Sequence, residues 1–120
     1  MEIKTHLIGN LKIAEVFSDV ILINDAGEGL ELLVNMYYQD FDRILVHETN
    51  IIPAFFDLKT RMAGDMLQKF SNYRMGLTIV GDFEKYDSKS LHDFILESNK
   101  GQLINFSQSV DEALDRMSNM

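Results

Sequence analysis

The chain contains no cysteine and no tryptophan, and proline occurs once among its 120 residues. Without cysteine, disulfide bonds, thiolate nucleophiles and cysteine-ligated zinc sites are excluded. Positive charge is also scarce, because 11 lysines and arginines stand against 19 aspartates and glutamates, which gives a formal net charge of -8. This balance disfavours binding to the phosphates of nucleic acids and to anionic membranes, so we expect neither as a partner.

Long hydrophobic runs are missing as well. The opening residues, MEIKTHLIGN, hold no apolar core of the kind that a secretory signal has. No apolar run approaches the roughly 20 residues that a membrane-spanning helix needs. Together with the lack of cysteine, these absences predict a cytoplasmic location. Hydrophobic residues make up 46% of the chain, which suffices for the core of one domain over residues 1–120.

The spacing of the hydrophobic residues indicates the fold class. Glu2–His6 and Leu11–Phe17 alternate between apolar and polar residues, as strands do, and Gly9-Asn10 supplies a tight turn between them. Beyond this hairpin, short apolar runs alternate with segments of helical spacing. The runs are Val20–Ile23, Arg43–His47, Leu77–Val80 and Leu103–Phe106. We therefore predict an α/β fold, an N-terminal β-hairpin followed by four βα units, with a mixed, mostly parallel sheet and flanking helices.

Polar side chains follow the predicted strands at their carboxyl ends. His47 and Glu48 come directly after one strand, and Asp82 follows the next. Because the carboxyl ends of parallel strands meet at one edge of a sheet, where ligands bind, we expect these residues to gather there. A histidine with two carboxylates can ligate a divalent cation or act as an acid–base pair. The alternative is structural, since such carboxylates also accept backbone hydrogen bonds in loops.

The segment VHETNIIPAFFDLKT, residues 46–60, carries the other candidates. Phe55 and Phe56 follow the only proline, and an exposed ring there would anchor a partner, whereas buried rings would close the loop over the core. Asp57 and Thr60 precede the next predicted helix, so each is a candidate N-cap. The hydroxyl of Thr60 is also a candidate phosphorylation site, because the positive end of a helix favours a phosphate.

Four stretches from His47 onward read HETNIIPAFFDLKT, AGDMLQKFSNYR, IVGDFEKY and SKSLHDFILESNKG. They resemble a small bacterial family, domain of unknown function 4180, and the resemblance covers nearly the whole chain. At the level of the fold, the chain also resembles the STAS domains of anti-sigma-factor antagonists, which are cytoplasmic βα superhelices. In STAS domains a phosphorylatable serine or threonine lies at the start of the second helix, and the surrounding surface docks a kinase. The resemblance implies such a place near Asp57 or Thr60, where Asp57-Leu58-Lys59-Thr60 replaces a short Asp-Ser-Ser-Gly run.

The sequence thus predicts a STAS-like regulatory or protein-interaction module that is not an enzyme and needs no cofactor. We expect a protein partner, and a working surface that includes His47, Glu48, Phe55, Phe56, Asp57, Thr60, Asp82 and Phe83. The alternative is a small-molecule-binding or metal-binding protein, or an enzyme, that uses His47, Glu48 and Asp82 at the strand edge. The sequence also leaves open a homodimer that forms through the edge of the hairpin.

Overall fold

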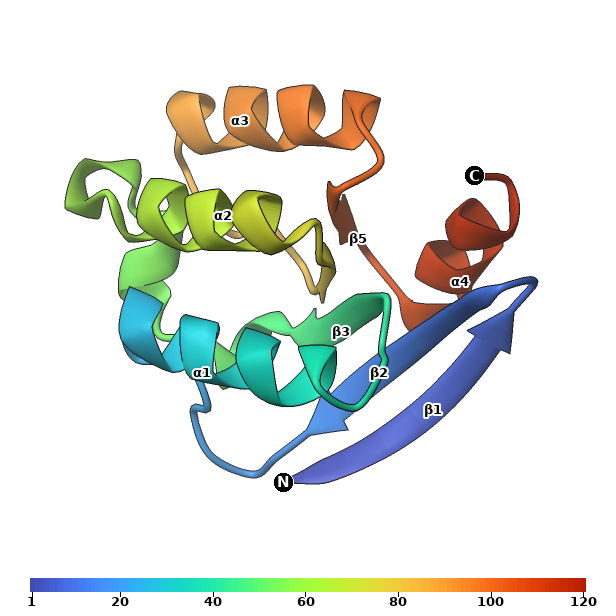
Figure 1. The fold of residues 1–120 in the computed structure, drawn as a ribbon. Helices are drawn as coiled ribbons and strands as arrows, with labels where there is room; N and C mark the ends of the chain where they lie inside the picture. Colours follow the sequence, from blue (N-terminus) through green and yellow to red (C-terminus); the bar gives the residue numbers. More distant parts are fainter.

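In the computed structural model, which describes residues 1–120, five strands form one sheet in the order β1-β2-β3-β4-β5 (Figure 1). The strands are β1 (Glu2–Ile8), β2 (Leu11–Phe17), β3 (Arg43–His47), β4 (Gly76–Val80) and β5 (Ile104–Ser107). β1 runs antiparallel to β2, and all later neighbours are parallel. The predicted α/β fold, a hairpin leading into four βα units, is therefore confirmed, with β2 as the first strand of the first unit.

Four helices cover the sheet, and they are α1 (Ala26–Tyr37), α2 (Met62–Tyr73), α3 (Lys89–Lys100) and α4 (Val110–Ser118). Right-handed crossovers between strands that follow one another in the sheet bring every connecting helix to the same face. Figure 1 shows α1, α2 and α3 together on that face, and α4, which follows the last strand, on the other. None of these helices has the length and apolar character that crossing a membrane requires.

The central strands of the sheet are buried on both faces, whereas the edge strand β1 is mostly exposed. Alternate residues of the central strands, such as Ile44 and Val46, enter the large core beneath α1–α3. The residues between them, such as Leu45, enter a small core that Ala113 and Met117 of α4 complete. Burial on both sides explains why β3 and β4 read as continuous apolar runs.

The segment Val20–Ile23 is not a strand of the sheet, so that part of the prediction is wrong. Val20 is 65% exposed and Ile21 is 39% exposed. Ile23 makes one isolated bridge, to Ile51, and its backbone N–H bonds to the carbonyl oxygen of Asn50. Apolar composition did not distinguish a buried strand from an extended connection that runs along a neighbouring loop. The strand that precedes α1 is β2.

Candidate functional site

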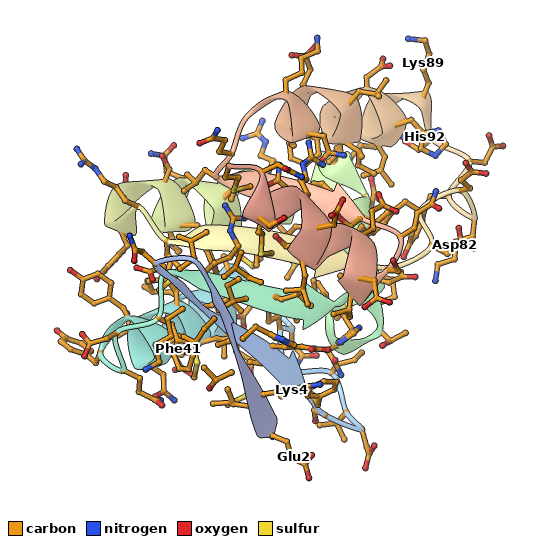
Figure 2. All side chains as sticks on the ribbon, turned by 90° about the vertical axis from the view of Figure 1, so that its right-hand side faces the viewer. Glu2, Lys4, Phe41, Asp82, Lys89 and His92 are labelled. Carbon is orange, nitrogen blue, oxygen red and sulfur yellow. The ribbon has the colours of Figure 1, made fainter.

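The ends of β3 and β4 lie side by side at the carboxyl edge of the sheet. His47 pairs with Val80 in the parallel register, so the residues that follow each of them leave the sheet at the same edge. Figure 2 shows Asp82 at this edge, across the molecule from Phe41, which precedes β3. The structure thus brings His47, Glu48 and Asp82 to one edge, as the sequence predicted. Their side chains nevertheless have separate partners.

Glu48 is buried, and its carboxylate contacts three residues of the loop that follows β4. Its side chain is only 7% exposed. Its Oε1 accepts a hydrogen bond from the backbone N–H of Asp82 at 3.3 Å and lies 2.6 Å from Nζ of Lys85. The hydroxyl of Tyr86 donates to its Oε2 at 3.0 Å. Burial, and then the hydrogen bond and the charge of Glu48, raise the pKa of Tyr86 to about 12. Glu48 therefore holds the loop between β4 and α3 against the end of β3.

His47 lies on the α4 face of the sheet and contacts a carboxylate that the sequence interpretation missed. Its Nε2 is 3.0 Å from Oε2 of Glu15, and Oε1 of the same residue is 2.8 Å from Nε2 of His6. Glu15 is 3% exposed, so two imidazole rings supply the partners of a buried carboxylate. The antiparallel register of β1 and β2 was the signal that could have found this cluster, because it pairs His6 with Ile13, two residues from Glu15.

Asp82 is exposed, and its carboxylate accepts a hydrogen bond from the backbone N–H of Glu84 at 3.2 Å. This is the loop role that the structural alternative predicted. No group of three or more histidine, aspartate or glutamate side chains is arranged to hold a metal ion. His47, Glu48 and Asp82 therefore share an edge without forming a common coordination or proton-transfer site.

The phenylalanines of the predicted surface are all interior. Phe55, Phe56 and Phe83 are 1%, 3% and 8% exposed. The ring of Phe56 stacks on Tyr86 at a centroid distance of 5.0 Å, and it lies 5.9 Å from the ring of Phe83. These rings close the loop over the core, which was one of the two interpretations of the Phe-Phe pair. The other interpretation, an exposed ring that anchors a partner, is wrong for this conformation.

Asp57 and Thr60 are exposed, but neither is the N-cap of α2. Asp57 caps the preceding 3-10 turn (Leu58–Thr60) by accepting from the N–H of Lys59 at 3.1 Å. The N-cap of α2 is Arg61, whose φ of 63° turns the chain between the 3-10 turn and the helix. Oγ1 of Thr60 lies beside the first helical residue and accepts from the N–H of Met62 at 3.3 Å. The prediction that Asp57 or Thr60 is the N-cap of α2 is wrong, because the sequence did not reveal that Arg61 adopts a left-handed conformation before the helix.

Two cavities lie near opposite edges of the sheet, and one of them is beside His47. A hollow of about 640 Å³ lies beside His47 and is lined also by Phe17, Thr49 and Asn50. A larger one, of about 850 Å³, lies near the amino ends of the parallel strands. Of the eight predicted site residues, only His47 lines either of these two cavities.

Comparison with known proteins shows which family the chain matches. A family model described as Domain of unknown function (DUF4180) matches residues 8–117, which is nearly the whole chain. No curated protein and no solved structure matches the chain. The resemblance to this family is therefore confirmed, and the looser likeness to STAS domains stays a prediction.

Proposed function

The chain belongs to the DUF4180 family, and we propose that it is a STAS-like regulatory module that binds another protein and is not an enzyme. The proposed contact surface is the exposed side of the segment Glu48–Arg61, between β3 and α2. Within it, Thr60 is the residue whose modification would regulate binding. The observation that supports the proposal is that this long segment has an inner side fixed to the core and an outer side that is polar and exposed.

The segment is far longer than the roughly 2–6 residues that usually connect a strand to a helix, and long ordered loops in compact domains are commonly functional. It is organised as three consecutive 3-10 turns, at Glu48–Asn50, Pro53–Phe56 and Leu58–Thr60. Its inner side is fixed to the body of the protein: the side-chain amide of Asn50 donates to the carbonyl oxygens of Ser18 and Val20, and the rings of Phe55 and Phe56 enter the core. A loop that is held in this way loses little conformational entropy on binding.

The outer side of the same segment is polar and exposed. Asp57, Lys59, Thr60 and Arg61 all face solvent just before α2. The first N–H groups of a helix lack partners within the helix and attract negative charge. A phosphate on Thr60 would meet this helix end between two cationic side chains. It would also end the short contacts of Oγ1 with the carbonyl oxygens of Ala54 at 2.7 Å and Asp57 at 2.8 Å, which close the last two turns.

The roles of the neighbouring acids support a binding function over catalysis. Glu48 is bonded on both carboxylate oxygens, and His47 faces Glu15. A general base or a metal ligand needs a lone pair that faces the substrate or the ion. A metal-dependent function would require His47, Glu48 and Asp82 to leave their present partners and converge.

Affinity capture from cells that express the protein tests the proposal. The wild type should retain a partner protein that Lys59→Glu does not retain, because the substitution reverses a charge on the contact surface. Thr60→Glu should release the same partner that Lys59→Glu releases. Ser90→Glu, which changes another exposed hydroxyl residue at the start of α3, is the matched control and should retain it. Identical sets of captured proteins for all four chains would contradict the proposed surface.

A further inference from the structure

The larger cavity lies at the edge of the sheet opposite the proposed contact surface. Its volume of about 850 Å³ is within the range of about 300–1,000 Å³ in which small molecules bind. Phe41, which lines it, marks this edge in Figure 2, across the molecule from Asp82. Met75, Leu103 and Met117 add apolar lining, and Tyr73, which is 42% exposed, adds an accessible aromatic ring. The cavity is therefore suited to a molecule with an apolar or aromatic body.

A buried arginine without an anionic partner also lines this cavity. Arg43 is 5% exposed, and no carboxylate lies within ion-pair distance of it. Its guanidinium instead donates to neutral acceptors: Nη1 is 3.1 Å from Oγ1 of Thr78 and 3.2 Å from the carbonyl oxygen of Leu103. Nη2 donates to the carbonyl oxygen of Gln102. Buried charged side chains are ordinarily paired with a charge of opposite sign.

One side of the guanidinium remains without a good acceptor. Nε has no hydrogen-bond partner in the protein, and the second contact of Nη2 is Sδ of Met120 at 3.8 Å, which is a weak acceptor. Gly76 lies against the guanidinium, since a Cβ at that position would be 2.6 Å from Cζ of Arg43. Only glycine leaves this room, and the arginine can therefore lie across the amino end of β4. Nε and Nη2 are the pair of donors with which arginine binds a carboxylate in bidentate geometry.

Two further arginines, Arg116 and Arg74, add positive charge near Arg43. Burial, and then the charge of Arg116, lower the pKa of Arg43 to about 10. Arg74, which ends α2 in a left-handed conformation, also lines the cavity. The charged side chains that line the cavity are two arginines, Arg43 and Arg74, and one aspartate, Asp42. A bound anion would relieve the repulsion and complete the pairing of the buried charge.

We propose that this cavity binds a small organic monocarboxylate, whose carboxylate pairs with Nε and Nη2 of Arg43 and whose apolar or aromatic body contacts Phe41 and Tyr73. The flexible side chain of Met120, which now covers this side of the guanidinium, moves aside on binding. A single negative charge fits better than a polyanion, because one buried cation is available and the protein as a whole repels anions. This site is separate from the proposed protein-binding surface, and either assignment can fail alone.

Nuclear magnetic resonance with simple probes tests the site. Phenylacetate at millimolar concentration should shift the Nε–H signal of Arg43 and the backbone amide signal of Gly76 in a saturable way. Its neutral isostere, phenylacetamide, should bind more weakly by a factor of about ten or more. The reason is that a hydrogen bond between two charged groups is stronger than one to a neutral amide. Equal shifts with the two probes, or no shift at Arg43 with either phenylacetate or acetate, would overturn the proposal.

Variants then assign the contacts. Tyr73→Ala should weaken phenylacetate binding, and Tyr38→Ala, at a 79% exposed tyrosine that does not line the cavity, should leave it unchanged. Arg43→Lys keeps the charge but loses the bidentate pair of donors, and should abolish the preference for the acid over the amide. Because Arg43 is buried, its variant is interpreted only if its circular dichroism spectrum is native. The tyrosine pair does not depend on that variant, and equal affinities for Tyr73→Ala and Tyr38→Ala would contradict the site.

Discussion

Gly81 lies directly against the buried side chain of Glu48, so closely that a methyl group on Gly81 would overlap with Cγ of the glutamate. Glu48 in turn holds the next residues of the same loop, through the N–H of Asp82, Nζ of Lys85 and the hydroxyl of Tyr86. Glu48, which the sequence marked as a candidate ligand, therefore has a structural role: its carboxylate holds the loop between β4 and α3 in place.

Gly81→Ala should lower the free energy of unfolding by about 1–3 kcal/mol, because Glu48 must leave its position or the loop must move. Gly64→Ala is the control of opposite sign. Gly64 lies in the first turn of α2, and outside the helix's own backbone no atom lies within 4 Å of an added Cβ. Alanine should raise the free energy of unfolding there by about 0.5–1 kcal/mol. Urea denaturation measures both, and a neutral Gly81→Ala would refute the close packing.

Tyr86 should lower the free energy of unfolding as the pH rises from 10 toward 12. Its pKa in the folded protein is raised from 10.0 to about 12, so the folded state holds the phenolic proton more tightly than the unfolded state. This contribution is complete below pH 10 and is lost as the pH rises toward 12. The free energy of unfolding of Tyr86→Phe should therefore fall less over this interval than that of the wild type. Parallel curves for the two proteins would be evidence against a perturbed Tyr86.

His6 and His47 should be coupled energetically, because both contact Glu15. Replacing either by alanine should cost about 1.5–3 kcal/mol, the range for a hydrogen bond to a charged group. The double variant should lose more than the sum of the two, since it leaves a buried carboxylate without any partner. A coupling energy above about 0.5 kcal/mol in a double-mutant cycle is expected. Additive losses would show that the two contacts are independent.

Phe56→Ala should act on stability, with an expected loss of about 3–5 kcal/mol for a large buried ring. Tyr38→Ala, at an exposed aromatic residue, should change the free energy of unfolding by less than about 0.5 kcal/mol. Thermal and urea unfolding compare them. A Phe56→Ala protein of native stability would mean that the ring is outside the core in solution, where it could serve a partner.

The parts of this fold that the sequence predicted are those that depend on local burial. β3 and β4 are buried on both faces, and their continuous apolar runs predicted this burial. The run Val20–Ile23 had the same composition but faces solvent along part of its length, since only Ile23 is fully buried. Composition reports hydrophobicity and does not report which hydrogen-bonding partner the backbone finds.

The parts that the sequence did not predict depend on pairs of residues that are distant in the chain. The cluster of His6, Glu15 and His47 exists because strand register aligns three strands. The hairpin register could have placed His6 near Glu15, but no local pattern places His47 beside them. Likewise, the role of Glu48 depends on Gly81 and Tyr86, which only the arrangement of β3 beside β4 brings near. Side-chain chemistry at a strand end therefore predicted the location of the polar residues and the backbone hydrogen bonds that Glu48 and Asp82 accept, but it did not predict their side-chain partners.

The central claim, that the outer side of Glu48–Arg61 contacts a protein partner, is tested most directly by photo-crosslinking in living cells. A photoreactive amino acid at position 59 should give a discrete adduct with one protein, and Thr60→Glu in the same chain should remove that adduct. The same group at position 96, where Leu96 is 64% exposed on α3, should give none. No adduct at position 59, or the same adducts at both positions, would contradict the account.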